Sequence, residues 1–269
     1  MGADIKALRV RIKSVDSTLH LTKAMGLVAS SKMRRANEGM RKGREHKASL
    51  EGFISPLSAS AECQKSVYMQ VRSEDVERTR IVIIAGDRGL AGGYNANVFR
   101  LGAQYRGAQF IPIGKRSCDK YAAPQNSSEH YTSEDSYKLA RTLCEDFAKG
   151  EYDRLGIIST KYVSMMTQTA QITWILPLER THSGISTGMI FEPDERSVLD
   201  AAIPEYVSGM LMCAIRESFA SEVAARRMAM DSAGKNATAM IDSLQLQYNR
   251  ARQGAITQEI TEIVAGAGE

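Results

Sequence analysis

A glycine-rich segment at residues 85–97 (AGDRGLAGGYNAN) carries the residue types best suited to binding a phosphate group. It follows an apolar run at residues 80–85 that predicts a buried strand, and a helical pattern comes after it. In α/β folds such a turn can hold a phosphate on backbone N–H groups at the start of the helix. Its glycines, however, fit neither GxGxxG nor GxxxxGK[ST], and no Lys-Ser/Thr pair follows to bind a γ-phosphate or magnesium. We therefore favour a structural turn over a nucleotide site. The residues of that turn are Gly86, Asp87, Arg88, Gly89, Gly92, Gly93 and Asn95.

The other groups with catalytic potential are isolated along the chain. No serine or cysteine motif surrounds the histidines, and the cysteines include no CxxC pair. Surface histidines and reduced, free thiols are the plain interpretation. The sequence therefore predicts no catalytic residue, no metal site and no cofactor. These residues are His20, His46, His130 and His182, and Cys63, Cys118, Cys144 and Cys213.

Positive charge gathers at the N-terminal end. Residues 1–50 hold 12 Lys/Arg against 4 Asp/Glu, a net +8, whereas the whole chain has a net charge of only +4. The basic run at residues 32–44 admits three interpretations: a nucleic-acid site, a solvated helix face, or a surface for an acidic protein. No aromatic residues alternate with these charges to stack on bases, which disfavours the first.

The first 60 residues contain no proline before Pro56 and predict one long helix with Asp4 as its N-cap. Apolar or small residues recur at alternating intervals of three and four, which is the pattern of a coiled-coil seam. Lys47 interrupts the pattern. The seam positions are Ile5, Leu8, Ile12, Val15, Leu19, Thr22, Gly26, Ala29, Met33, Ala36, Met40, Gly43, Lys47, Leu50, Ile54 and Leu57.

The C-terminal end predicts a second long helix, because no proline follows Pro204 and that residue suits a first helical turn. The simplest way to cover two such helices is an antiparallel pair, with Leu19 close to Tyr248. A shorter helical bundle interrupted by glycines is the alternative. The apolar positions of this helix are Leu211, Ile215, Phe219, Met240, Leu244, Tyr248, Ala251, Ala255 and Ile263.

The middle of the chain alternates strand and helix patterns. Strands are predicted at 80–85, 109–113, 155–159 and 171–176. Helices are predicted near 94–105 and from a Ser133 cap to Gly150, with a link at 191–196 into the last helix. This alternation indicates a small doubly wound, Rossmann-like α/β domain. The predicted fold class is thus α/β with long helical arms. The predicted domains are a coiled-coil shaft of residues 1–60 and 204–269, and a globular domain of residues 75–195.

Length and composition fit this organisation. The chain of 269 residues is 43% hydrophobic and 25% charged, as soluble globular proteins are. No run of about 20 apolar residues suggests a membrane span, and charged residues near the start argue against a signal peptide.

Three segments, in chain order, resemble the gamma subunit of F-type ATP synthases. Residues 12–36 (IKSVDSTLHLTKAMGLVASSKMRRA) are similar to the family's N-terminal helix. Residues 86–100 (GDRGLAGGYNANVFR) resemble the Asp-Arg-Gly-Leu-x-Gly-Gly-x-Asn turn of its α/β domain. Residues 217–267 include YNRARQGAITQEITEIVAGA, which is similar to the family's most specific stretch. The sequence departs from the family pattern at Gly26 and Gly254, where larger residues are usual.

The resemblance implies roles for particular residues. Arg252, Gln253 and Thr257 match the family's polar contacts to a beta-subunit loop, and Lys23 and Met25 lie in the part of the shaft that faces the beta subunits. The apolar end of the chain would turn in a greasy bearing. The bearing residues are Ile256, Ile260, Ile263 and Val264. The glycine-rich turn would bind no nucleotide.

The resemblance also implies a place and a mechanism. One copy of the chain would act as the central-stalk rotor inside a hexamer of alpha and beta subunits. Its α/β domain would lie with the epsilon subunit on the membrane c-ring. The chain would be a non-catalytic subunit, peripheral to the cytoplasmic face of a bacterial plasma membrane. It would couple proton or sodium flow to ATP synthesis or hydrolysis, without binding nucleic acid.

Two rival functions remain open on the sequence alone. One is a nucleotide- or phosphate-using α/β enzyme with helical extensions, which would retain nucleotide when purified. The other is a coiled-coil scaffold or nucleic-acid-binding protein, whose DNA binding would fall steeply with salt.

Overall fold

Two long helices form the two ends of the chain, in a computed structural model that describes residues 2–72, 78–180 and 190–266. Helix α1 spans Gly2–Ala59, and helix α5 spans Glu195–Gly266. The helical arms that the sequence predicts are therefore confirmed, and Pro56 lies inside the last turns of α1.

The start of α5 differs from the prediction, because Pro204 lies inside the helix and not in its first turn. The carboxylate of Asp194 accepts hydrogen bonds from the N–H of Ser197 (2.9 Å) and from its hydroxyl (2.7 Å), as an N-terminal cap does. Leu199 and Ile203, just before the proline, are fully buried. Their packing outweighs the hydrogen bond that a proline removes from a helix interior.

By their contacts the residues form two compact units. Unit 1 consists of residues 1–30 and 226–269, and unit 2 consists of residues 31–225. The units group residues that contact one another, whereas the predicted domains separate the long helices from the α/β region, so the two divisions are not directly comparable. The predicted domain limits of 1–60 with 204–269, and of 75–195, stay a prediction.

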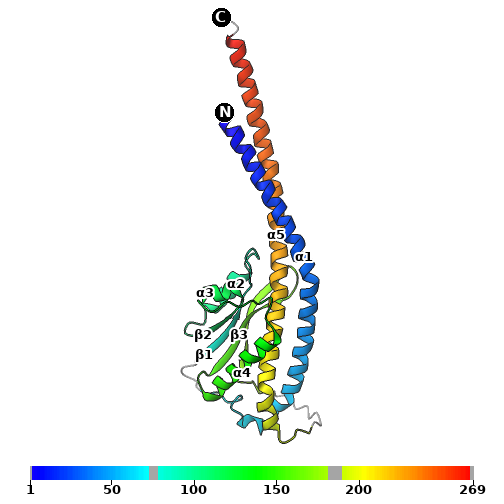
Figure 1. The fold of residues 1–269 in the computed structure, drawn as a ribbon, viewed down its shortest axis with the longest axis vertical. Coiled ribbons are helices and arrows are strands. Elements are labelled where there is room, and N and C mark those ends of the chain that lie inside the picture. Colours follow the sequence, from blue (N-terminus) through cyan, green and yellow to red (C-terminus); the bar gives the residue numbers. More distant parts are fainter. Residues whose placement is uncertain (1, 73–77, 181–189, 267–269) are drawn as a thin grey trace. The chain divides into compact units, whose positions relative to one another are not determined.

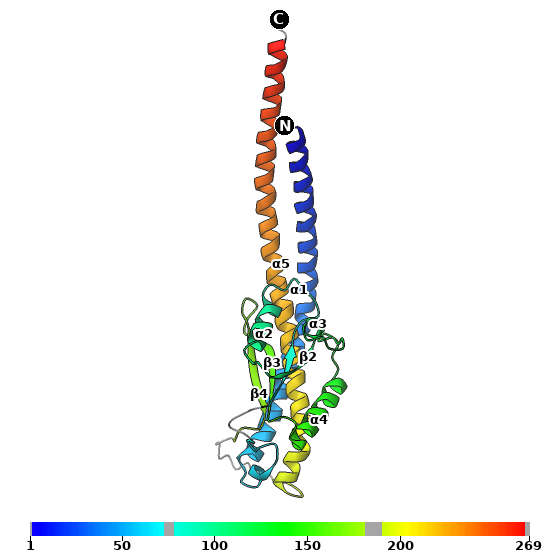
Figure 2. The ribbon, with the colours of Figure 1, turned by 90° about the vertical axis from the view of Figure 1, so that its left-hand side faces the viewer.

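The two helices of unit 1 lie side by side and run antiparallel (Figures 1 and 2). A Cβ added to Gly26 would lie 3.7 Å from the Cβ of Met230. A Cβ added to Gly234 would lie 3.7 Å from the Thr22 hydroxyl oxygen and 3.9 Å from the Leu19 side chain. Lower residue numbers in α1 thus lie opposite higher residue numbers in α5, which confirms the predicted antiparallel arrangement.

The buried stripe of α1 is the seam that the sequence predicts. Every predicted seam position from Ile5 to Leu57 is buried or half-buried. In α5 the prediction fails at Met240, which is 46% exposed, and the half-buried Ile241 takes its place. Ile241 continues the spacing of four and three between Ala237 and Leu244, both of which are buried.

The register of the pair differs from the prediction. Leu19 lies against Gly234 and not near Tyr248, which is 14 residues further along α5. At 1.5 Å per residue this is an offset of roughly 20 Å.

Within unit 2 the same two helices pack closely at Gly209. A Cβ on that residue would lie 2.2 Å from Leu50 Cδ1 and 3.1 Å from His46 Nε2. Any side chain at this position would therefore require Leu50 to move.

A four-stranded mixed sheet forms the centre of unit 2. Its strands are β1 (Thr79–Ile84), β2 (Gln109–Ile113), β3 (Arg154–Tyr162) and β4 (Gln168–Leu176). They lie in the order β2-β1-β3-β4. The first three are parallel, and β4 is antiparallel to β3. All four predicted strands are confirmed, with β3 and β4 longer than predicted.

Helices cover both faces of this sheet, as a doubly wound fold requires. Helix α2 (Tyr94–Gly102) packs on one face over a core that includes Ile81, Ile83 and Ile158. On the opposite face, α4 (Ser133–Lys149) and the residues of α1 and α5 that belong to unit 2 enclose a larger core. The short helices η1 (Cys63–Lys65) and α3 (Lys115–Lys120) were not predicted.

Thr132, and not the predicted Ser133, caps α4. Its hydroxyl accepts a hydrogen bond from the Asp135 N–H (3.1 Å), and the Asp135 carboxylate accepts one from the Thr132 N–H (3.1 Å). This reciprocal pair needs an acid three residues after the cap, which Thr132 has and Ser133 lacks. The predicted stop at Gly150 is confirmed, with that glycine in the left-handed conformation.

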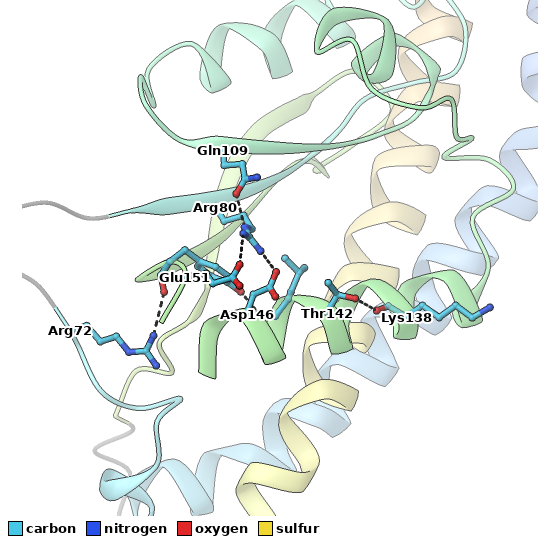
Figure 3. A network of polar contacts seen from close by, with 9 residues as sticks. Arg72, Arg80, Gln109, Lys138, Thr142, Asp146 and Glu151 are labelled. Atoms are coloured by element: carbon cyan, nitrogen blue, oxygen red, sulfur yellow. Dashed lines mark hydrogen bonds and ion pairs between the residues drawn. The ribbon is translucent and has the colours of Figure 1, made fainter. Parts of the chain in front are cut away.

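A buried arginine joins α4 to the sheet (Figure 3). Arg80 of β1 is only 9% exposed and donates hydrogen bonds to Asp146 of α4 (2.5 Å) and to the side chain of Gln109 (2.9 Å). Its guanidinium also lies 4.5 Å from the centre of the Tyr152 ring. Because each partner satisfies part of one guanidinium, this cluster of charges has a structural role.

Helix α5 contains one 18-residue window that is long and apolar enough, by composition, to cross a membrane. The sequence was predicted to contain no membrane span. Because 56% of it is buried in the structure, it has the character of a core helix.

Candidate functional site

The glycine-rich turn lies between β1 and α2, where the sequence predicts it, and Asp87 anchors it. The Asp87 carboxylate accepts hydrogen bonds from the backbone N–H groups of Lys115 (3.1 Å), Ser128 (2.9 Å) and Glu129 (3.1 Å), and from the Ser127 hydroxyl (2.5 Å). Burial alone would raise the pKa of Asp87, but these hydrogen bonds together hold that pKa below its ordinary value. The carboxylate therefore ties the turn to the loop before α4.

Asn95 fixes the other side of the turn. Its side-chain oxygen accepts a hydrogen bond from the Gly86 N–H (2.9 Å), and its amide donates to the carbonyl of Arg88 (3.4 Å). In the stretch between Arg88 and Asn95, the backbone turns through Leu90 and Gly92, which adopt positive φ angles of 60° and 58°. The Gly86 N–H, which a phosphate-binding loop would turn toward its ligand, is thus already bonded.

Helix α5 occupies the crevice in which doubly wound folds bind ligands, at the carboxyl ends of the strands. The Ser218 hydroxyl accepts a hydrogen bond from the Thr160 N–H of β3 (3.1 Å), and the Ser218 carbonyl accepts one from the Tyr94 hydroxyl (3.0 Å). The Ser221 hydroxyl donates to the Thr160 carbonyl (3.2 Å). Both serines are fully buried or nearly so. Because these hydrogen bonds place α5 where a ligand would bind, they favour a structural role for the glycine-rich turn.

The buried side chain of Glu222, which was not among the predicted site residues, packs directly against Gly86. Glu222 is 4% exposed, and a Cβ on Gly86 would lie 2.6 Å from its carboxyl carbon. The two residues are 136 positions apart, so no local pattern could have indicated the contact.

We expect Gly86→Ala to destabilise unit 2 by about 1–3 kcal/mol, the usual cost of inserting a methyl group into a packed site. Gly93→Ala is the matched control, because a Cβ there would lie 3.6 Å from the end of the Asn97 side chain. It should cost under about 0.5 kcal/mol. The measurement is denaturant unfolding followed by fluorescence of Trp174, the only tryptophan, which lies in β4. Equal stability of the two variants would contradict the close fit at Gly86.

The predicted partner-binding residues near the C-terminus share one face of α5. At about 100° per residue, Arg252, Gln253 and Thr257 fall with the four apolar residues within about 140° of the helix circumference. The apolar four, Ile256, Ile260, Ile263 and Val264, are 48% to 67% exposed. Arg252, Gln253 and Thr257 are exposed as well. Figures 1 and 2 show this end of α5 running past the start of α1 within unit 1. The structure thus leaves an apolar helix end without an intramolecular partner among the described residues.

Lys23 and Met25 lie on α1 in the same unit. Lys23 is exposed and lines a groove of about 520 Å³ that Gly26 and Gly234 also line. Met25 is half-buried and lies outside the lining of that groove. That both residues face the beta subunits stays a prediction.

Much of the basic run is neutralised inside the chain. Lys32 pairs with Glu129, and Arg44 donates to Glu217 (2.5 Å) and to the Tyr162 carbonyl (2.7 Å). Lys42 and Arg41 have acidic partners one turn away in α1, Glu38 and Glu45, at 3.3 and 3.4 Å. The excess of charge counted from the sequence therefore overstates what this face offers to an acidic or nucleic-acid partner.

The isolated histidines and cysteines form no site in the part of the chain that the structure describes. His20, His46 and His130 are exposed, and His182 lies outside the described residues. All four cysteines are free and buried. Burial raises the pKa of Cys144 to about 12 and also raises the pKa values of Cys63 and Cys213, so these thiols are unreactive. Across the described ranges, no three His, Cys, Asp or Glu side chains gather in a way that could hold a metal ion.

Comparison with known proteins identifies the family. The family model described as ATP synthase matches residues 4–268. The chain is 39% identical to an ATP synthase gamma chain of Ruminococcus albus, covering 97% of this chain and 96% of that protein. It is 37% identical to an ATP synthase gamma chain of Alkaliphilus metalliredigens, with 99% of each covered.

The chain belongs to the ATP synthase gamma chain family. Solved structures share the fold of this gamma-chain family member at lower identity. A chain of the Euglena gracilis mitochondrial ATP synthase, in a complex of OSCP, F1 and c-ring, aligns with a TM-score of 0.68 and 17% identity over 98% of this chain and 94% of that one. A chain of the Tetrahymena thermophila central stalk and c-ring aligns with a TM-score of 0.62 and 21% identity over 79% of this chain and 99% of that one.

Proposed function

We propose that this chain is the central-stalk rotor of an F-type ATP synthase, a non-catalytic subunit that couples ion flow to ATP chemistry by rotation. The observation that carries the proposal is the end of α5, where four large apolar side chains stand exposed on a helix that has run past its partner. Exposed apolar surface of this kind is costly in water and is typical of a surface that another protein covers. Membership of the gamma chain family supports the ring of alpha and beta subunits as the protein that covers this surface.

In this assembly unit 1 enters a hexamer of alternating alpha and beta subunits. Ile256, Ile260, Ile263 and Val264 turn in an apolar bearing formed by that ring. On the same helix face, Arg252, Gln253 and Thr257 contact a beta-subunit loop. Lys23 and Met25 face the beta subunits further along the shaft.

The shaft consists of residues 1–60 and 204–269, and the globular domain of residues 75–195 lies with the epsilon subunit on the membrane c-ring. One copy serves each complex, at the cytoplasmic face of a bacterial plasma membrane. The chain needs no cofactor and no nucleic acid. In the globular domain, α5 fills the ligand crevice with Ser218, Ser221 and Glu222, which supports a structural role for the glycine-rich turn.

The mechanism rests on the asymmetry of the shaft. The beta subunits are chemically identical, so they differ only in the face of unit 1 that each one contacts. A shaft changes the conformation of a beta subunit only through contacts that differ between its conformations. Each turn therefore carries every site through the same sequence of affinities, and by linkage ATP hydrolysis drives the shaft backward.

The isolated chain should neither hydrolyse ATP nor bind it tightly. The Gly86 N–H is bonded to Asn95, and the crevice at the strand ends is occupied by α5. We expect calorimetry with ATP and magnesium to show no binding at micromolar concentration. Micromolar affinity, or nucleotide retained through purification, would favour the α/β enzyme instead. Binding to DNA that weakens steeply with salt would favour the scaffold.

A further inference from the structure

The two edges of the sheet are protected unequally. At the β2 edge, the Asn126 side chain accepts a hydrogen bond from the Gly114 N–H (2.7 Å) and donates one to the Pro112 carbonyl (3.0 Å). Pro112 itself, within the strand, has no N–H to offer. A side-chain amide and a proline therefore close this edge to another strand.

The opposite edge, formed by β4, has neither device. The strand reads QTAQITWIL and contains no proline, lysine or arginine, the residues that usually block an edge. Among the described residues its only neighbouring strand is β3. In the part of the chain that the structure describes, no strand pairs with the backbone N–H and C=O groups on its outer side.

A groove of about 560 Å³ runs along this edge. The five consecutive residues of 171–175 line it. Successive side chains of a strand point to opposite faces of the sheet, and indeed Ile172 packs with the core on the α2 side whereas Ile175 belongs to the core on the other side. Five consecutive residues can line one groove only along the strand's edge. The groove therefore exposes the backbone of β4.

Helix α1 forms the facing wall. Glu51, Ile54, Ser55 and Ser58 line the groove at helical spacings of three, one and three, so they present one face of that helix. Glu179, just beyond β4, adds a second carboxylate. Among the residues that line the groove these two are charged, and both are acidic; Glu51 also pairs with Lys47 of α1 (3.5 Å), which lies outside the lining. The groove thus combines a free strand edge, apolar side chains and negative charge.

We propose that the β4 edge binds an extended segment of a companion subunit, which adds a fifth strand to the sheet. Main-chain hydrogen bonds to 171–175 supply the binding, as in other cases of strand addition. The negative charge of Glu179, together with that of Glu51 once its weak surface pairing with Lys47 is exchanged, selects a segment that carries lysine or arginine beside apolar side chains. The inference rests on the proposed function, because it takes the companion from the ATP synthase complex.

Hydrogen–deuterium exchange on the free chain and on the assembled complex tests the proposal. The outward-pointing amides of 171–175 should exchange at least about tenfold more slowly in the complex than in the free chain. Amides of β2, whose edge Asn126 already occupies, should not change.

A matched pair of variants tests the same edge by binding. Thr173→Lys places a long cation in the groove, where it repels the incoming basic segment, and should lower recovery of the companion subunit about tenfold. Thr169→Lys makes the same change on the same side of β4 but outside the groove, at an exposed position, and should leave recovery unchanged. Glu51→Gln with Glu179→Gln should weaken binding severalfold without altering the fold.

The outcomes separate this inference from the proposed function. A chain that assembles with the alpha and beta subunits, but whose 171–175 amides keep their free exchange rate, overturns the inference and leaves the rotor intact. Protection that appears in the free chain as its concentration rises assigns the edge to a second copy, which also overturns the inference. A chain that assembles with no ATP synthase subunit overturns both.

Discussion

A covalent bond from residue 23 to one beta subunit should stop multi-site ATP turnover in the assembled complex. Lys23→Cys suits this experiment because the side chain is exposed and lines an open groove. The native cysteines are all buried, so they do not compete for the reagent. The bond holds the asymmetric shaft at one angle, and the remaining sites never receive the next contact. We expect the ATPase rate to fall at least tenfold and to recover when the bond is reduced.

A disulfide within the shaft is the matched control. Thr22→Cys with Gly234→Cys joins α1 to α5, because a Cβ on residue 234 lies 3.7 Å from the Thr22 hydroxyl oxygen, close to the reach of a disulfide. Both parts of this bond belong to the same rotor, so ATPase should persist. Turnover that continues at the unlinked rate despite the bond to the beta subunit would make this chain a static scaffold.

Replacing Arg252 and Gln253 together by alanine should uncouple rotation from ATP chemistry without unfolding the chain. Both side chains are exposed in the free chain, so the fold should lose under about 0.5 kcal/mol. A charge-assisted contact buried against a partner loses about 2–5 kcal/mol when one side is truncated. We therefore expect coupled ATP synthesis to fall by at least about thirtyfold, measured in membrane vesicles with an imposed ion gradient.

Gln258→Ala is the control for this change. Gln258 lies in the same exposed stretch of α5 but about 100° outside the proposed face, where it donates a hydrogen bond to Glu262 (2.8 Å). It should leave coupling unchanged. If the double variant synthesises and hydrolyses ATP at the normal rates, the contact implied by the family does not exist in this chain.

Periodicity predicted the elements of this fold well, because burial in long helices and strands repeats at fixed intervals. The seam of α1 follows the threes and fours of the sequence from Ile5 to Leu57. The same signal failed at Met240 because two apolar residues stand side by side there. Ile241, and not Met240, continues the spacing from Ala237 to Leu244.

Periodicity could not set the register of the pair. The predicted contact of Leu19 with Tyr248 misses the observed one with Gly234 by 14 residues, which is two heptads. A seam that repeats every seven residues matches equally well after such a shift. Steric fit between particular side chains has to decide, and Gly209, whose added Cβ would clash with the Leu50 side chain, is one such place.

Contacts between distant parts of the sequence were also beyond prediction. Glu222 closes on Gly86, and Ser218 bonds to β3, but neither α5 residue carries a local signal. The net charge of residues 1–50 had a similar limit as a guide to partners. That count includes Lys32 and Arg44, which Glu129 and Glu217, from outside this segment, neutralise in the folded chain. The residues proposed to contact partners came from resemblance, since their partners lie outside the chain.

The length by which α5 exceeds α1 in unit 1 has a mechanical consequence. Where two helices share a seam, a twisting force divides between two hydrogen-bonded rods that brace each other, and their stiffnesses add. Beyond the start of α1 the whole torque passes through one rod, held only by its own backbone hydrogen bonds. The last turns of α5, from about Ile256 onward, are therefore the softest spring in this unit. Wherever a partner resists the turning of this end, elastic twist collects there first, next to the exposed apolar residues.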